Sequence, residues 1–189
     1  KTRLRAAKSL GPKGIPVLVK LARDPGVLRE VRDDAVGHML RLNAPDQIAS
    51  SIRQLLTSSH AEVFRSVLTM VRRARYTPAL ATLVEMVTDS RSAGDQVAAI
   101  TEVLGEIGDR SMQSLLITLL NHDFLLVRRR AAVALGRLGG PSSLGPLEEL
   151  ARSGNVNRRL KELCSSAIKS IRARSGMGGG ESIEGAGAS

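Results

Sequence analysis

One stretch of the sequence, residues 123–139, decides the fold class. It reads DFLLVRRRAAVALGRLG. Val127, Ala131 and Leu138 stand at positions i, i+4 and i+11, which share one face of an α-helix. The run ends in glycine, and a second glycine and a proline follow directly. The stretch therefore predicts an amphipathic helix that ends at a glycine, with another helix beginning at the proline.

The same apolar spacing recurs along the whole chain. Positions equivalent to Val127 are Val31, Val63, Gln96 and Leu160, and the five positions are separated by 32, 33, 31 and 33 residues. Four residues later come Ala35, Val67, Ile100, Ala131 and Cys164. Seven residues beyond these lie Leu42, Ala74, Ile107, Leu138 and Ile171, with Leu10 one period earlier. A fixed period of this length indicates helical repeats, in which stacked units bury one continuous core.

A second apolar ladder follows the first in each unit. Its members are Leu18, Ile52, Val84, Leu116 and Leu147, each with an apolar partner three residues later. Short breaks that contain Gly or Pro separate the two ladders, as at residues 11–14, 43–46, 77–78, 108–109 and 139–141. We expect the glycines to end one helix in the left-handed conformation and the prolines to open the next. Each unit is thus predicted to be a helical hairpin.

These patterns predict an all-α fold, a right-handed α-solenoid of about five to six stacked hairpins. The repeat domain covers residues 1–174, with units at about 1–26, 27–59, 60–91, 92–123, 124–155 and 156–174. Residues 175–189 are predicted to be a disordered tail rich in Gly and Ser. Composition agrees, because hydrophobic residues make up 42% of the chain and aromatic residues only 2%, which favours an aliphatic core of packed helices.

Residues 123–139 resemble a HEAT-like repeat of the kind also found in phycobilisome lyases. Residues 24–43 and 95–108 are weaker copies. Residues 61–89 depart from the pattern, because Arg72-Arg73-Ala74-Arg75 stands where Leu138-Gly139 falls in the best copy. The resemblance implies stacked HEAT-like hairpins whose second helices line a concave, protein-binding face.

The exposed positions of the second helices are therefore the candidate binding surface. Offsets of three and seven residues place three rows on one stripe of each helix. The rows are Lys13, Gln47, Ala79, Ser111 and Ser142; then Pro16, Ser50, Thr82, Ser114 and Gly145; then Lys20, Gln54, Met86, Thr118 and Glu149. We predict a non-catalytic scaffold that binds an unidentified protein or peptide, with contacts from Lys20, Gln54, Met86, Gln113, Thr118 and Glu149.

Two other functions remain open. The net charge of +10 favours an electrostatic binder of nucleic acid or of an acidic protein. Its candidate patch lies on first helices, at Arg128, Arg129, Arg130, Arg158, Arg159 and Lys161; a row of basic residues along the second helices, which a phosphate backbone would require, is absent. A bilin lyase-like subunit is implied by the resemblance alone, and Cys164 aligns with the buried ladder.

The sequence shows no catalytic or cofactor-binding constellation. His38, His60 and His122 fall in different units with no second ligand at metal spacing. The His-Glu pairs of HEAT-like deoxyhypusine hydroxylases and the tryptophans of HEAT-like DNA glycosylases are both missing. We therefore predict no cofactor and no enzyme activity. No run approaches the roughly 20 apolar residues that span a bilayer, so we expect a cytoplasmic chain without membrane insertion, although a longer parent chain could add an N-terminal signal or domain.

Overall fold

The described residues of the chain are almost entirely helical. The computed structural model describes residues 2–58, 60–89, 92–154 and 156–176. This part contains eleven α-helices and four short 3-10 helices, with no β-strand. The all-α prediction is confirmed. The chain forms two compact units, Lys1–Gly108 and Asp109–Ser189.

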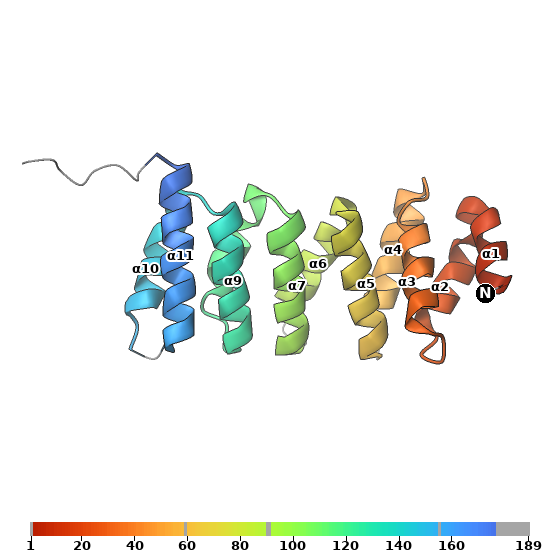
Figure 1. The fold of residues 1–189 in the computed structure, drawn as a ribbon, viewed down its shortest axis with the longest axis horizontal. Coiled ribbons are helices and arrows are strands. Elements are labelled where there is room, and N and C mark those ends of the chain that lie inside the picture. Colours follow the sequence, from red (N-terminus) through yellow and green to blue (C-terminus); the bar gives the residue numbers. More distant parts are fainter. Residues whose placement is uncertain (1, 59, 90–91, 155, 177–189) are drawn as a thin grey trace, which may run out of the picture. The chain divides into compact units, whose positions relative to one another are not determined.

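The first unit has two layers of helices (Figure 1). First helices α1 (Thr2–Ser9), α3 (Arg29–Met39), α5 (Ala61–Ala74) and α7 (Gly94–Ile107) form one layer, because each packs on the next. The other layer holds α2 (Ile15–Arg23), α4 (Pro45–Leu56) and α6 (Leu80–Thr88), with η1 (Gly11–Gly14) before α2 and η2 (Thr77–Ala79) before α6. Each second helix packs against the first helix that follows it in sequence.

The second unit repeats this packing. It contains η3 (Arg110–Met112), α8 (Gln113–Leu119), α9 (Leu125–Leu138), η4 (Pro141–Ser143), α10 (Leu144–Arg152) and α11 (Arg158–Arg174). The first helices α9 and α11 pack side by side, and α8 and α10 pack on α9 and α11, respectively (Figure 1). Ser175 and Gly176 follow α11, and the rest of the predicted disordered tail, residues 177–189, lies outside the described residues.

The core follows the predicted ladders. Ala35, Val67, Ile100, Ala131 and Cys164 are all completely buried, and so are Leu18, Ile52, Leu116 and Leu147. The third position of the first-helix ladder is less regular. Ile107 and Ile171 are buried, Leu42 and Leu138 are half-buried, and Leu10 and Ala74 are exposed. Leu10 and Ala74 are exposed at the ends of α1 and α5, so their assignment to the core was wrong.

The register of α6 differs from the predicted one by a single residue. Leu83 is completely buried, whereas Val84, the predicted ladder member, is only half-buried. Before this helix, α5 is followed by Arg75 in the left-handed conformation, with φ of 47°. The amide of Tyr76 then donates to the carbonyl of Val71 at 3.0 Å. This turn has no glycine, but it keeps the ladder spacing, because Leu83 follows Val67 by the same interval of 16 residues that separates Ile100 from Leu116 and Ala131 from Leu147.

The predicted role of the glycines is confirmed at one turn only. Gly11, after α1, has φ of 55° and lies in the left-handed region. Gly108 and Gly139 instead have φ of −73° and −65° in extended backbone. At Gly139 the requirement is space, because a Cβ atom would come within 2.6 Å of the Leu135 carbonyl oxygen and 2.9 Å of Ser143 Oγ.

Candidate functional site

The predicted surface rows of the second helices are exposed, with α6 as the exception. Every row member in α2, α4, α8 and α10 is exposed to solvent. The row members in the 3-10 segments before α2, α8 and α10, namely Lys13, Ser111 and Ser142, are exposed as well. In α6 the shift of register buries Ala79 and Thr82 and leaves Met86 half-buried. Glu85 takes the exposed position that corresponds to Lys20 and Gln54. Along the first unit this row therefore reads Lys20, Gln54, Glu85.

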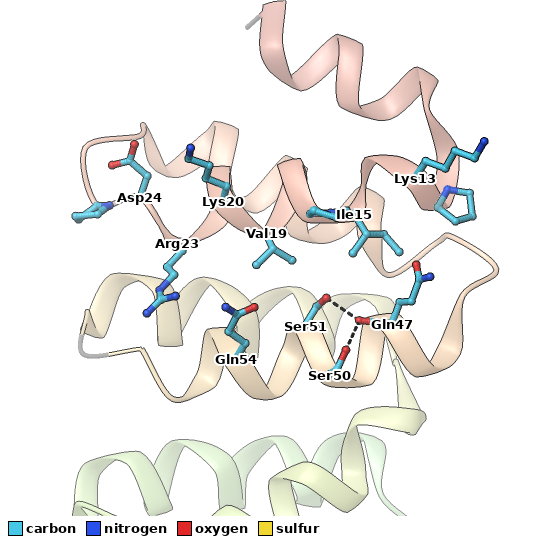
Figure 2. Close-up of a pocket in the computed structure, with 13 residues that line it drawn as sticks. Lys13, Ile15, Val19, Lys20, Arg23, Asp24, Gln47, Ser50, Ser51 and Gln54 are labelled. Carbon is cyan, nitrogen blue, oxygen red and sulfur yellow. Dashed lines mark hydrogen bonds between the residues drawn. The ribbon is translucent and has the colours of Figure 1, made fainter.

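A groove of about 820 Å³ lies between α2 and α4, on these rows. Figure 2 shows the two helices running in the same direction, with Ile15 and Val19 pointing from α2 toward α4. Both side chains are largely buried, with exposed fractions of 3% and 8%, and they form an apolar floor together with prolines of η1, α2 and the loop that follows α2. The local sequence explains this floor, because apolar residues of α2 recur at helical spacing on the side of the helix that faces α4.

Gln47, Ser50 and Gln54 form the wall of the groove on α4. Ser50 and Ser51 both donate to the carbonyl of Gln47, at 2.9 and 2.6 Å, so these hydroxyls are bound within their own helix (Figure 2). The side-chain amides of Gln47 and Gln54 make no hydrogen bond with any described residue. They are exposed and separated by two helical turns, so they are available to a ligand along the groove.

Three cationic side chains edge the groove on the α2 side. Lys13, Lys20 and Arg23 are exposed, and none forms an ion pair or a hydrogen bond with a described residue. A cation on the next helix behaves differently. Arg53 of α4 pairs with Glu85 of α6 at 2.5 Å, and the hydrogen bond and charge of Arg53 lower the pKa of Glu85 below its ordinary value. The unpaired positive charge of this layer is thus concentrated at α2.

A buried arginine holds the loop that ends the groove. Arg32 of α3 is only 3% exposed, and its guanidinium donates to the carbonyls of Asp24, Pro25 and Val27 at 3.3, 3.4 and 3.1 Å. These carbonyls follow α2 directly, and Asp24 and Pro25 line the groove. Arg32 was not among the predicted site residues. Its signal was a charged residue directly after the ladder position Val31, where the best copy has Arg128 after Val127.

The other predicted contact residues lie in the second unit. The side chain of Gln113 is not free, because its Oε1 accepts from the amide of Gly140 at 2.6 Å and its Nε2 donates to Ser142 Oγ. Thr118 is exposed and donates to the carbonyl of Ser114 at 3.2 Å, and Glu149 is exposed on α10. Of the six predicted residues, the structure therefore brings only Lys20 and Gln54 together at one groove.

The predicted electrostatic patch lies on α9 and α11, which pack against each other. Arg128, Arg129, Arg130 and Lys161 are half-buried, whereas Arg158 and Arg159 are exposed. The latter two share the carboxylate of Glu162, at 2.9 and 3.4 Å. Part of the positive charge of this patch is therefore neutralised within α11.

Cys164 is completely buried in α11, and burial raises the pKa of its thiol to about 11. The thiol is therefore protonated at neutral pH and inaccessible from solvent, as its place in the apolar ladder predicts. Within the described residues there is no group of three or more His, Cys, Asp or Glu side chains that could hold a metal ion. No helix of this part of the chain is both long and apolar enough to cross a membrane.

Layers of first and second helices, repeated at about 32 residues, define the class of all-α repeat proteins. Residues 80–168 match the family of HEAT repeats and therefore carry HEAT repeats, as the resemblance predicted. Human deoxyhypusine hydroxylase in complex with glycerol is a solved structure similar to this chain, with 19% sequence identity and a TM-score of 0.38. The alignment covers 90% of this chain and 79% of the hydroxylase. A search of curated proteins finds no match.

Proposed function

We propose that this chain is a non-catalytic scaffold that binds a partner protein or peptide through the exposed rows of its second helices. HEAT repeats generally serve as protein-interaction scaffolds, and residues 80–168 carry them. The observation that carries the proposal is the groove between α2 and α4, in which an apolar floor lies between polar walls. A concave apolar surface with a few polar groups around it is the usual form of a binding site.

Site-specific photo-cross-linking tests the proposal on the full chain. A photoreactive amino acid replaces Gln54, which lines the groove, or Ala74, which is exposed at the end of α5 and serves as the control. We expect cross-links in native lysate from position 54 to a discrete polypeptide, and none to that polypeptide from position 74. Equal labelling from both positions, or no polypeptide cross-linked at position 54, would overturn the proposal.

Salt dependence separates the scaffold from an electrostatic binder. Contacts between arginines and phosphates weaken steeply as ionic strength rises, because counterions are released when they form. If the full chain retains only nucleic acid and loses it at moderate salt, the patch on α9 and α11 would be the binding surface. Its residues are Arg128, Arg129, Arg130, Arg158, Arg159 and Lys161. A bilin lyase-like role would instead require chromophore transfer that is sensitive to Cys164→Ala, and the burial of this thiol disfavours it.

A further inference from the structure

We infer that the groove between α2 and α4 binds an extended, acidic segment of a partner protein, with apolar side chains between the acidic ones. The inference rests on the proposed function, and it names the partner chemistry of one site. Three features of the groove support it: the unpaired cations, the unpaired amides and the apolar floor.

The groove carries a net positive charge, because three cations and one carboxylate line it. Lys13, Lys20 and Arg23 form no ion pair with a described residue. The one carboxylate that lines the groove, Asp24, accepts a hydrogen bond from the amide of Gly26 at 2.9 Å. Three cations around one partly apolar groove attract a carboxylate-bearing ligand and repel a basic one. The equivalent exposed positions of α2, α4 and α6 are Lys20, Gln54 and Glu85, so their charge changes from positive through neutral to negative. The preference for an acidic ligand therefore belongs to α2.

The unpaired amides favour an extended ligand over a helical one. A helix satisfies its own backbone N–H and C=O groups, whereas an extended chain leaves them free for side-chain amides. Gln47 and Gln54 can each offer one donor and one acceptor to such a backbone. They lie seven residues apart in α4, which is about 10 Å along the helix, a distance that an extended ligand covers in about three residue steps.

The apolar floor sets the third requirement. Ile15 and Val19 point into the groove, and alternate side chains of an extended segment point to opposite sides. One set of side chains can therefore meet the floor while the other reaches toward Lys13, Lys20 and Arg23. A nucleic acid would leave this floor without an apolar partner, and three cations are few for a phosphate backbone. The groove thus fits a segment in which acidic and apolar residues alternate.

Fluorescence anisotropy with two designed peptides tests the inference. One labelled peptide alternates glutamate with leucine, the other alternates lysine with leucine, and both are titrated with the full chain at moderate salt. We expect the acidic peptide to bind at least tenfold more tightly than the basic one. Lys20→Glu should lower the affinity for the acidic peptide about tenfold, because it replaces an attraction with a repulsion. Arg73→Glu, an equal charge change at an exposed position of α5, should leave affinity unchanged.

Each contrary result has a defined meaning. If the two peptides bind equally, or if Arg73→Glu acts like Lys20→Glu, the groove does not select acidic segments and the inference fails. Cross-linking of a polypeptide from position 54 would still support the scaffold in that case, so the two failures are distinguishable. Tighter binding of a labelled oligothymidylate than of the acidic peptide would assign the groove to nucleic acid. A dimer that Lys20→Glu dissociates would assign it to a second copy of the chain, and either result overturns the inference.

Discussion

The second helices of the two units differ in how neighbouring helices are joined. In the first unit α2 and α4 leave a groove between them, and the amides of Gln47 and Gln54 have no described partner. In the second unit the amide of Gln113, at the start of α8, bonds to Gly140 and Ser142 at the start of the α10 segment. Neighbouring second helices can therefore either leave polar side chains free for a ligand or be joined by a side-chain hydrogen bond.

The difference comes from where the polar side chain stands on its helix. Gln113 is half-buried at the first residue of α8, close to the backbone amide of Gly140, which is buried. A buried N–H without a partner is costly, so the side chain of Gln113 has a structural role. Gln54 is exposed two turns into α4 and has no such amide to satisfy. Gln113 therefore has a structural role, and we propose that Gln54 is the residue available for binding.

The largest expected effect is the loss of stability when a core residue of the second unit is truncated. It tests whether core packing, rather than polar contacts between helices, stabilises this unit. Leu135 of α9 is completely buried, whereas Leu138, one turn later, is half-buried. Leu135→Ala should lower the free energy of unfolding by about 2–5 kcal/mol, because it leaves a cavity. Leu138→Ala serves as the matched control and should cost less. Urea unfolding followed by circular dichroism measures both, and equal losses would contradict the assigned core.

The repeat could be predicted from sequence because it rests on local spacing. Ala35, Ala131 and Cys164 occupy one ladder position and are all completely buried, as a helical period requires. The register of α6 was predicted one residue too late, although Leu83 follows Val67 by the same 16 residues that separate Ile100 from Leu116. The left-handed conformation of Arg75 could not be predicted, because such a non-glycine residue has no reliable sequence signal.

The features of the groove are non-local. Its volume depends on how side chains of α2 and α4 pack, and the bond between Gln113 and Gly140 joins residues 27 positions apart. Rows of exposed residues follow from helical spacing alone, so Lys20 and Gln54 were found. Which rows enclose a groove, and which polar groups are already satisfied, requires the three-dimensional structure.

Alkaline pH should distinguish the cores of the two units. Cys164 stands in the second unit where the first has Ala35, Val67 and Ile100. Burial raises the pKa of this thiol to about 11 in the folded chain, above about 8.5 for an unfolded one. The thiol's contribution to stability is therefore full below the unfolded pKa and is lost as pH rises through the folded one.

We expect the wild-type chain to lose stability relative to Cys164→Ala between about pH 9 and about pH 11, a range that follows from this raised pKa. Burial also raises the pKa of Tyr76, but both proteins keep that residue, so the difference isolates the thiol. Urea midpoints at several pH values measure it. Parallel pH profiles for the two proteins would show that the thiol is not buried in the folded state.

The most direct test of the comparison exchanges the two glutamines for alanine. Gln113→Ala leaves the amide of Gly140 without its partner and should cost about 1–3 kcal/mol of unfolding free energy. Gln54→Ala removes an exposed side chain and should change the unfolding free energy by less than about 0.5 kcal/mol. It should also lower the affinity for the acidic peptide. Urea unfolding and anisotropy on both variants separate the two roles. A larger stability loss for Gln54→Ala than for Gln113→Ala would reverse the assignment.

The smallest expected effect concerns two exposed carboxylates, one in each unit. Arg53, on the neighbouring helix, lowers the pKa of Glu85, whereas hydrogen bonds from Ser111 lower that of Asp109. Each carboxylate therefore stabilises the fold above its unfolded pKa and loses this contribution as pH falls through its lower folded pKa. Salt screens exposed ion pairs. It acts less on the local bonds that Asp109 accepts from the amide and hydroxyl of Ser111, at 2.8 and 2.5 Å.

Carboxyl pKa values measured by NMR at low and high salt would test this distinction. We expect the pKa of Glu85 to rise toward its ordinary value in high salt, while that of Asp109 stays low. Arg53→Gln should reproduce the salt effect at Glu85 and leave Asp109 unchanged, because it removes the cation responsible. If the two carboxylates respond equally to salt, the contact between α4 and α6 is not an ion pair in solution. Arg53 would then join Lys13, Lys20 and Arg23 as unpaired charge, and the cationic surface would extend beyond α2.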